Sequence, residues 1–285
     1  MITRRDFFKK SVMTIAGAAL PLAAFELIDG KKLLAMEQAD KSSKVRWVFV
    51  VDTYKCVGCG MCVKACKLEN EVPYDANATR TWVERYVLTK DGQVHVDSPK
   101  GARDGFTTAK IDLGVKPEDS SPKDILEKPE ENSPKDAHTY EVIDPKDIDK
   151  AFFVPKLCNQ CENPPCVQVC PVGATYQTPD GVVLVDRTWC IGCGYCIMGC
   201  PYGVRFFHPV YHTAEKCNWC YHRISKGLKT ACVDACPFGA RQIGNIKDPN
   251  DPVTKIIMNE RVGVLKEEYG TKPQVYYIGL SKEVK

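Results

Sequence analysis

The sequence lacks the features that mark several large classes of protein. Its net charge is only +3 over 285 residues, and no basic stretch rich in aromatic residues occurs, so nucleic acid is not an expected partner. It has no glycine-rich phosphate loop, no serine–histidine pair and no paired-carboxylate motif, so we expect neither an independent catalytic site nor a direct small-molecule substrate. Outside the N-terminus no apolar run approaches the ~20 residues of a membrane helix.

The N-terminal segment 1–35 has the pattern of an export signal. Arg4 and Arg5 are followed by an aromatic pair and a lysine, and an apolar stretch covers 12–25. This order is typical of a twin-arginine signal, which is read as an address. The alternative is a basic helix start before a short buried helix. The pattern predicts a protein exported in folded form to the periplasmic face of the cytoplasmic membrane, with the signal either cleaved or kept as an anchor.

Cysteine is abundant and unevenly placed. The 16 cysteines form four groups of four, and the segment 67–157 contains none. Cysteines used only for packing would not be distributed in this way. In chain order the groups are Cys56, Cys59, Cys62, Cys66; Cys158, Cys161, Cys166, Cys170; Cys190, Cys193, Cys196, Cys200; and Cys217, Cys220, Cys232, Cys236.

The first and third groups share the spacing C-x2-C-x2-C-x3-C and align without gaps, which indicates an internal duplication. This spacing is that of bacterial ferredoxins, in which the fourth cysteine binds the neighbouring cluster. Three cysteines at two-residue gaps lie on one tight loop, and we expect the fourth to begin the next helix. The glycines expected to let this loop approach a cluster are Gly58, Gly60, Gly192 and Gly194. The apolar residues expected to keep water away are Val57, Met61, Ile191, Tyr195 and Ile197.

The second and fourth groups have longer gaps, C-x2-C-x4-C-x3-C and C-x2-C-x11-C-x3-C, and still place three thiols on one loop. Proline follows the last cysteine of groups two, three and four, whereas Lys67 follows that of group one. Disulfides, structural zinc and one [3Fe–4S] cluster are alternatives. Because two-residue gaps suit disulfides poorly, and a third such cysteine is superfluous for zinc, the pattern favours four [4Fe–4S] clusters.

Short strands are expected between the cysteine groups. Apolar, β-branched runs predict strands at 47–51 and 81–88, and a turn centred on Asp180 and Gly181 predicts a hairpin over 174–185. A matching hairpin could begin at 240–246, and a closing strand is expected at 274–280. The segment 91–150 is polar with weak periodicity, and predicts a surface insertion or long loop.

The four groups in this order, the twin-arginine start and the run CNWCYHRISKGLKTACVDACPFGAR resemble a known family over roughly 45–245. It is the four-cluster ferredoxin-like iron–sulfur subunit of membrane-associated oxidoreductases, such as the dimethyl sulfoxide, tetrathionate and polysulfide reductases and the formate-dependent nitrite reductase system. The resemblance implies an α+β, loop-rich fold of two ferredoxin-like double-cluster modules with small β-hairpins and short helices. The modules would comprise 45–90 plus 211–250, and 151–210, with a C-terminal extension at 251–285.

The resemblance also implies how the cysteines are shared. Group one would pair with group four, and group two with group three. The implied sets are Cys56, Cys59, Cys62 and Cys236 (cluster 1); Cys217, Cys220, Cys232 and Cys66 (cluster 2); Cys158, Cys161, Cys166 and Cys200 (cluster 3); and Cys190, Cys193, Cys196 and Cys170 (cluster 4).

The function implied is electron relay between an integral-membrane, quinone-reactive subunit and a catalytic molybdopterin or multihaem cytochrome subunit. A freestanding periplasmic polyferredoxin and a structural zinc protein are the alternatives. Purification as a lone soluble monomer would favour the first of these, and zinc without iron or sulfide would favour the second.

Overall fold

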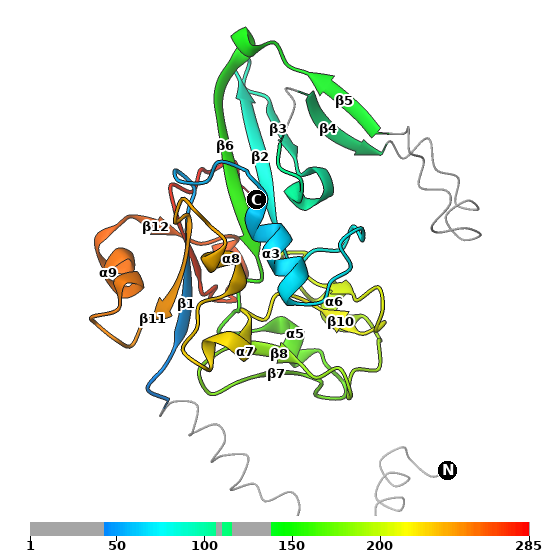
Figure 1. The fold of residues 1–285 in the computed structure, drawn as a ribbon, viewed down its shortest axis with the longest axis vertical. Helices are drawn as coiled ribbons and strands as arrows, with labels where there is room; N and C mark the ends of the chain where they lie inside the picture. Colours follow the sequence, from blue (N-terminus) through cyan, green and yellow to red (C-terminus); the bar gives the residue numbers. More distant parts are fainter. Residues whose placement is uncertain (1–42, 107–109, 116–137, 285) are drawn as a thin grey trace, which may run out of the picture. The chain divides into compact units, whose positions relative to one another are not determined.

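The computed structural model describes the backbone of residues 43–106, 110–115 and 138–284, and the side chains of these residues except within 107–142. Arg4 and Arg5 lie outside the described residues. The chain divides into two units, Met1–Ser43 and Lys44–Lys285, and every element below belongs to the second. This unit combines small sheets, short helices and long loops, as an α+β fold does (Figure 1). In the described part of the chain, no helix is both long and apolar enough to cross a membrane.

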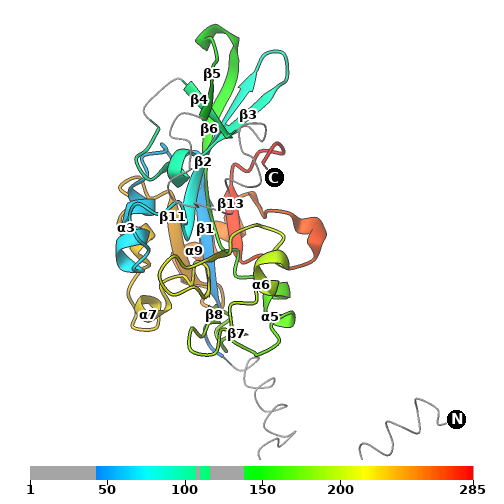
Figure 2. The same ribbon diagram turned by 90° about the vertical axis from the view of Figure 1, so that its right-hand side faces the viewer.

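The largest sheet joins the start of the unit to its end. Its order is β11-β1-β13-β12, with β1 antiparallel to β11 and parallel to β13 (Figure 2). The elements are β1 (Trp47–Asp52), β11 (Arg241–Asn245), α9 (Pro252–Asn259), β12 (Val262–Gly263) and β13 (Val275–Ile278). The strands predicted at 47–51 and 274–280 are therefore confirmed. Residues 240–246 do form a strand, but it pairs with β1 instead of starting a hairpin.

Alternation along β1 gives the sheet two apolar faces. Val48 and Val50 pack with Val253 of α9 on one face. Phe49 and Val51 belong to the main core, which contains several of the cysteines, on the other. Because successive side chains of a strand point to opposite faces, five consecutive apolar residues can serve both cores. The sheet therefore connects the outer helix to the cysteine-bearing loops.

A second sheet has the order β3-β2-β6. Its strands are β2 (Thr81–Thr89), β3 (Val94–Asp97) and β6 (Ile148–Leu157), and β4 (Lys110–Val115) pairs separately with β5 (His138–Val142). The strand predicted at 81–88 is confirmed as β2. The described part of 91–150 is more regular than its weak periodicity indicates, because β3 and β6 are held by pairing with β2. The described residues also contain the 3₁₀ turns η2 (Pro99–Ala102), η4 (Pro145–Asp147) and η5 (Glu267–Tyr269).

Short helices follow the cysteine loops. They are α3 (Met61–Glu69), α5 (Pro165–Gln168), α6 (Tyr195–Met198), α7 (Tyr221–Ile224) and α8 (Ala231–Asp234). Helix α3 of the first group contacts α8 of the fourth, and α5 of the second contacts α6 of the third (Figure 1). The predicted hairpin is confirmed as β7 (Thr175–Gln177) and β8 (Val183–Val185), and β9 (Phe206–Phe207) pairs with β10 (Ala214–Glu215).

Candidate metal centres

The duplicated cysteine loops have the backbone shape that their glycines allow. Gly58 and Gly60 have φ of 69° and 74°, and the equivalent glycines of the third group have φ of 69° and 77°. A left-handed residue at the N-cap turns the chain directly into α3. Cys62 therefore lies in the first turn of the helix and Cys66 in its second half. The prediction that the fourth cysteine begins the helix is wrong for this reason.

Two of the cysteine sets line cavities. One cavity has a volume of about 320 Å³ and the other about 340 Å³. Each combines the first three cysteines of one group with the last cysteine of another. The first is lined by Cys56, Cys59, Cys62 and Cys236, and the second by Cys158, Cys161, Cys166 and Cys200.

The last cysteine of the first group lies among the thiols of the fourth group. Burial raises the pKa of Cys66 well above its usual value, and after burial the charges that raise it most are those of Cys217, Cys232 and Cys220. Helix α3 thus carries its second cysteine away from the loop that precedes it.

The last of the expected sets comprises Cys190, Cys193, Cys196 and Cys170. Burial raises the pKa of Cys196, the charge of Arg205 opposes this rise, and the thiols of Cys166 and Cys190 add to it. Burial raises the pKa of Cys170, but the backbone N–H groups of the residues that follow, led by Thr175, outweigh it and leave the pKa lowered. The Thr175 N–H donates to Cys170 Sγ over 3.4 Å. Backbone N–H groups of this kind stabilise a thiolate ligand.

The sets follow one another in a single order. Besides burial, Cys232 raises the pKa of Cys62, Cys158 raises that of Cys217, and Cys166 raises that of Cys196. These electrostatic interactions link the set expected for cluster 1 to that expected for cluster 2, then to that for cluster 3 and then to that for cluster 4. Of the sixteen cysteines only two are exposed, Cys59 and Cys193, which belong to the first and last sets.

The donor set fits Fe4S4 cubes. None of the sixteen cysteines forms a disulfide, and burial raises the pKa to about 11 for Cys56 and to about 12 for Cys161 and Cys217. Such thiols ionise only beside a strong positive charge, as bound metal supplies. Among the described residues, no three His, Cys, Asp or Glu side chains converge as ligands of a single ion. A cube spreads its thiolates over four irons and needs no such convergence.

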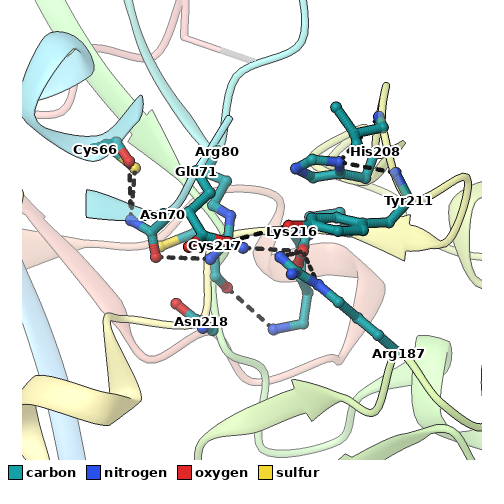
Figure 3. A network of polar contacts seen from close by, with 12 residues as sticks. Cys66, Asn70, Glu71, Arg80, Arg187, His208, Tyr211, Lys216, Cys217 and Asn218 are labelled. Atoms are coloured by element: carbon teal, nitrogen blue, oxygen red, sulfur yellow. Dashed lines mark hydrogen bonds and ion pairs between the residues drawn. The ribbon is translucent and has the colours of Figure 1, made fainter. Parts of the chain in front are cut away.

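A polar network that sequence reasoning missed supports the cluster 2 set (Figure 3). Asn70, just after α3, donates from Nδ2 to Cys66 Sγ over 3.6 Å and to Cys220 Sγ over 3.7 Å. Arg80 Nη1 donates to Asn70 Oδ1 over 2.8 Å and so fixes the orientation of the amide. Hydrogen bonds to ligand sulfur raise the reduction potential of a cluster. No spacing signal singles out Asn70, because its partners are distant in sequence.

The same network continues into an ion-pair triad around a buried carboxylate. Arg80 Nη2 lies 2.9 Å from Glu215 Oε2, and Arg187 Nη2 lies 2.8 Å from the same oxygen. Burial raises the pKa of Glu215, but the two guanidinium groups outweigh it and hold the pKa below its usual value. The triad ties the loop after α3 to strand β10, which precedes the fourth cysteine group.

Lys67, which stands where the other three groups have proline, has a structural role. The residue is buried, and its Nζ donates to the carbonyl oxygens of Pro73, Ala76 and Ala78 over 3.0, 2.7 and 2.9 Å. It thereby folds the loop after α3 back onto the helix.

Most of the apolar residues expected to shield the duplicated loops from water are exposed. Val57 and Met61 line the first cavity, yet they are 49% and 47% exposed, and Ile191 and Tyr195 are 65% and 55% exposed. Only Ile197 is half-buried. Cys59 and Cys193 are exposed as well, so these side chains do not shield the two loops from solvent.

Comparison with known proteins assigns both halves of the cysteine-bearing region. Families described as "4Fe-4S dicluster domain" match residues 55–174 and residues 149–246. The sequence is 34% identical over 281 residues to the B subunit of tetrathionate reductase from Salmonella typhimurium, covering 98% of this chain and 88% of the relative. It is 38% identical over 252 residues to the B subunit of tetrathionate reductase from Archaeoglobus fulgidus, covering 88% of each. The B chain of polysulfide reductase from Wolinella succinogenes is 29% identical over 82% of this sequence and 94% of its own.

Proposed function

Because this chain belongs to the family of four-cluster iron–sulfur electron-transfer subunits of oxidoreductase complexes, we propose that it connects a quinone-reactive membrane subunit to a catalytic subunit. That catalytic partner carries molybdopterin or, as the alternative, is a multihaem cytochrome. The chain's cofactors are four [4Fe–4S] clusters, which supply one-electron transfer. Its own residues bind the clusters, fix their spacing and set their electrostatic surroundings.

The observation that carries the proposal is the single order of the four thiol sets. Neighbouring sets interact through Cys62 with Cys232, Cys217 with Cys158, and Cys166 with Cys196. The exposed cysteines belong to the two end sets. A protein that only passes electrons on needs such a sequence of centres, with an accessible centre at each end for each partner.

Within this function we assign the cysteines in crossed sets, in two ferredoxin-like modules. Cys236 completes the cluster of the first loop, Cys66 that of the fourth, Cys200 that of the second and Cys170 that of the third. The two cavities and the surroundings of Cys66 support the first three assignments. We further propose that Arg4 and Arg5 direct the folded protein to the periplasmic side of the membrane.

The function is tested with the complex purified from solubilised membranes through a tag on this chain. Oxidised clusters in the complex should be reduced by a quinol, or dithionite-reduced clusters reoxidised by a quinone, as followed by electron paramagnetic resonance. The chain purified alone should carry about sixteen irons and sixteen sulfides and react with dithionite but not with the quinol. A chain that always purifies as a soluble monomer would instead be a freestanding carrier. Molybdenum and haem analysis of the complex identifies the catalytic partner.

The crossed assignment is tested by pairs of variants. Cys66→Ala and Cys220→Ala should each remove about four irons and abolish the same resonance signal, whereas Cys56→Ala should abolish a different one. If Cys66→Ala and Cys56→Ala abolish the same signal, each group closes its own cube. That result would refute the assignment and leave the electron-transfer function intact.

A further inference from the structure

Two buried arginines occupy the same place in a motif that occurs twice. The sequence reads CPYGVR at 200–205 and CPFGAR at 236–241. Arg205 and Arg241 are 4% and 1% exposed. After Cys170 the related run CPVGAT has Thr175 at the arginine position. Because each motif starts at the last cysteine of a group, the turn that follows brings the arginine five residues later back to the cluster-binding region.

Each guanidinium lies at the wall of one cysteine cavity. Arg241 lines the cavity that contains Cys236, and Arg205 lines the one that contains Cys200. Arg241 Nη1 donates to Thr81 Oγ1 over 2.9 Å, and Arg205 Nη2 donates to Thr175 Oγ1 over 3.1 Å. The two modules therefore repeat one arrangement of arginine, threonine and cavity.

Neither arginine forms an ion pair with a carboxylate of the described residues. Within the described part of the chain, Nη2 of Arg241 and both Nε and Nη1 of Arg205 are buried with no hydrogen-bond partner. A buried cation is strongly unfavourable unless an anion lies close to it. The anions available here are the thiolate-ligated clusters, whose net charge is negative and becomes more so on reduction.

The charge of each arginine reaches both cysteine sets of its module. Burial lowers the pKa of Arg241, but the negative charges of neighbouring thiolates outweigh burial, so that the pKa is raised. The largest of these contributions come, in descending order, from Cys62, Cys232 and Cys56. In the other module, burial raises the pKa of Cys166, Cys196 and Cys200. The positive charge of Arg205 opposes the rise for each of these thiols. The geometry agrees: Arg205 donates to Thr175, whose N–H donates to Cys170 Sγ, and strand β11, which starts at Arg241, contacts helix α8, which contains Cys232. Each arginine therefore lies close to the sets of two neighbouring clusters.

We propose that Arg205 and Arg241 are buried counter-cations, one for each module, that raise the reduction potentials of the two clusters to which each lies close. The inference rests on the four-cluster function proposed above. Reduction adds one negative charge to a cluster, and a fixed cation nearby stabilises that charge most where water is excluded. A cation shared by two clusters also lessens the repulsion between electrons on neighbouring centres.

The test is a redox titration of the purified, fully loaded protein, followed by electron paramagnetic resonance. In Arg241→Met, the reduction potentials of two of the four centres should fall by about 59 mV, which corresponds to about tenfold weaker binding of the electron at a given potential. The potentials of the other two centres should not change. Arg205→Met should affect the complementary two. Arg241→Lys should restore most of the shift. The matched control is Lys255→Met, which removes one positive charge from an exposed position of α9.

Each outcome decides the proposal. Unchanged potentials in Arg241→Met with all irons retained, or a shift equal to that of Lys255→Met, would overturn it. If Arg241→Met loses iron, the iron contents of Arg241→Gln and Arg241→Lys decide. Iron retained only in the lysine variant supports a need for positive charge at this position, whereas loss of iron in all three variants refutes it. The iron count of the wild type and its reduction by quinol in the complex test the function separately, since neither depends on these variants.

Discussion

Replacing Glu215 by glutamine should destabilise the protein strongly although the residue touches no cluster. The side chains of Glu215 and Arg80 are 6% and 4% exposed, so the substitution leaves Arg80 buried without its carboxylate. Removing one partner of a buried pair costs about 3–5 kcal/mol. Arg80 keeps its hydrogen bond to Asn70 and lies near the Cys66 thiol, so we expect the lower end of that range. At about 2–4 °C per kcal/mol for a chain of this size, the unfolding midpoint should fall by about 6–12 °C.

The assay is anaerobic thermal unfolding followed by circular dichroism and by sulfide release, at one scan rate because cofactor loss is irreversible. The matched control is Arg187→Gln, which removes the more exposed partner, 35% exposed, and should cost about 0–1 kcal/mol. The pKa of Glu215 is lowered in the folded state, so its contribution is fully present above the unfolded value of about 4.3 and is lost only in acid. The difference between wild type and Glu215→Gln should therefore be constant from about pH 5 to 8. Equal midpoints for the two variants would refute the reasoning.

Three further predictions concern other parts of the chain. Gly60→Ala should lose about four of sixteen irons, because φ is 74° and the new Cβ would overlap a backbone carbonyl; Gly92→Ala, at φ 87° with open space, should keep them all. Lys67→Met should lower the unfolding midpoint by about 6 °C or more, since three partly buried bonds from a charged donor to loop carbonyls are lost, and limited proteolysis should then cut the loop after α3; an unchanged midpoint would contradict this. Replacing Arg4 and Arg5 by lysine should leave the loaded protein in the cytoplasm, as cell fractionation would show; unchanged localisation would mean that the segment is not an export signal.

Local patterns in the sequence were sufficient to predict the features that depend on neighbouring residues. The cysteine spacing indicated the clusters, and the β-branched run at 47–51 indicated β1. These features depend on a few adjacent residues whose conformations are restricted by chemistry. The strand 94–97, by contrast, is held mainly by its pairing with β2, and its own sequence carries only a weak signal.

The supporting network could not be predicted because its members are distant in sequence. Asn70, Arg80 and Glu215 come together only when the loop after α3 meets β10. The two arginines could have been identified from the sequence, since CPYGVR and CPFGAR repeat in it, but the repeat alone does not say that the guanidinium is buried. Burial and orientation follow from the tertiary fold and not from spacing.

The joining of Cys236 to the cavity of the first loop has a consequence for the order in which the protein can be made. Three cysteines of that cavity are synthesised within the first 62 residues, and the fourth about 170 residues later. The central strand β1 likewise waits for β11 and β13 from the far end of the chain. A nascent chain therefore carries an incomplete thiol set through most of its synthesis, exposed to oxidation and to stray metal ions. Cluster insertion at this site must follow the synthesis of Cys236, and the first three thiols have to be kept reduced until then.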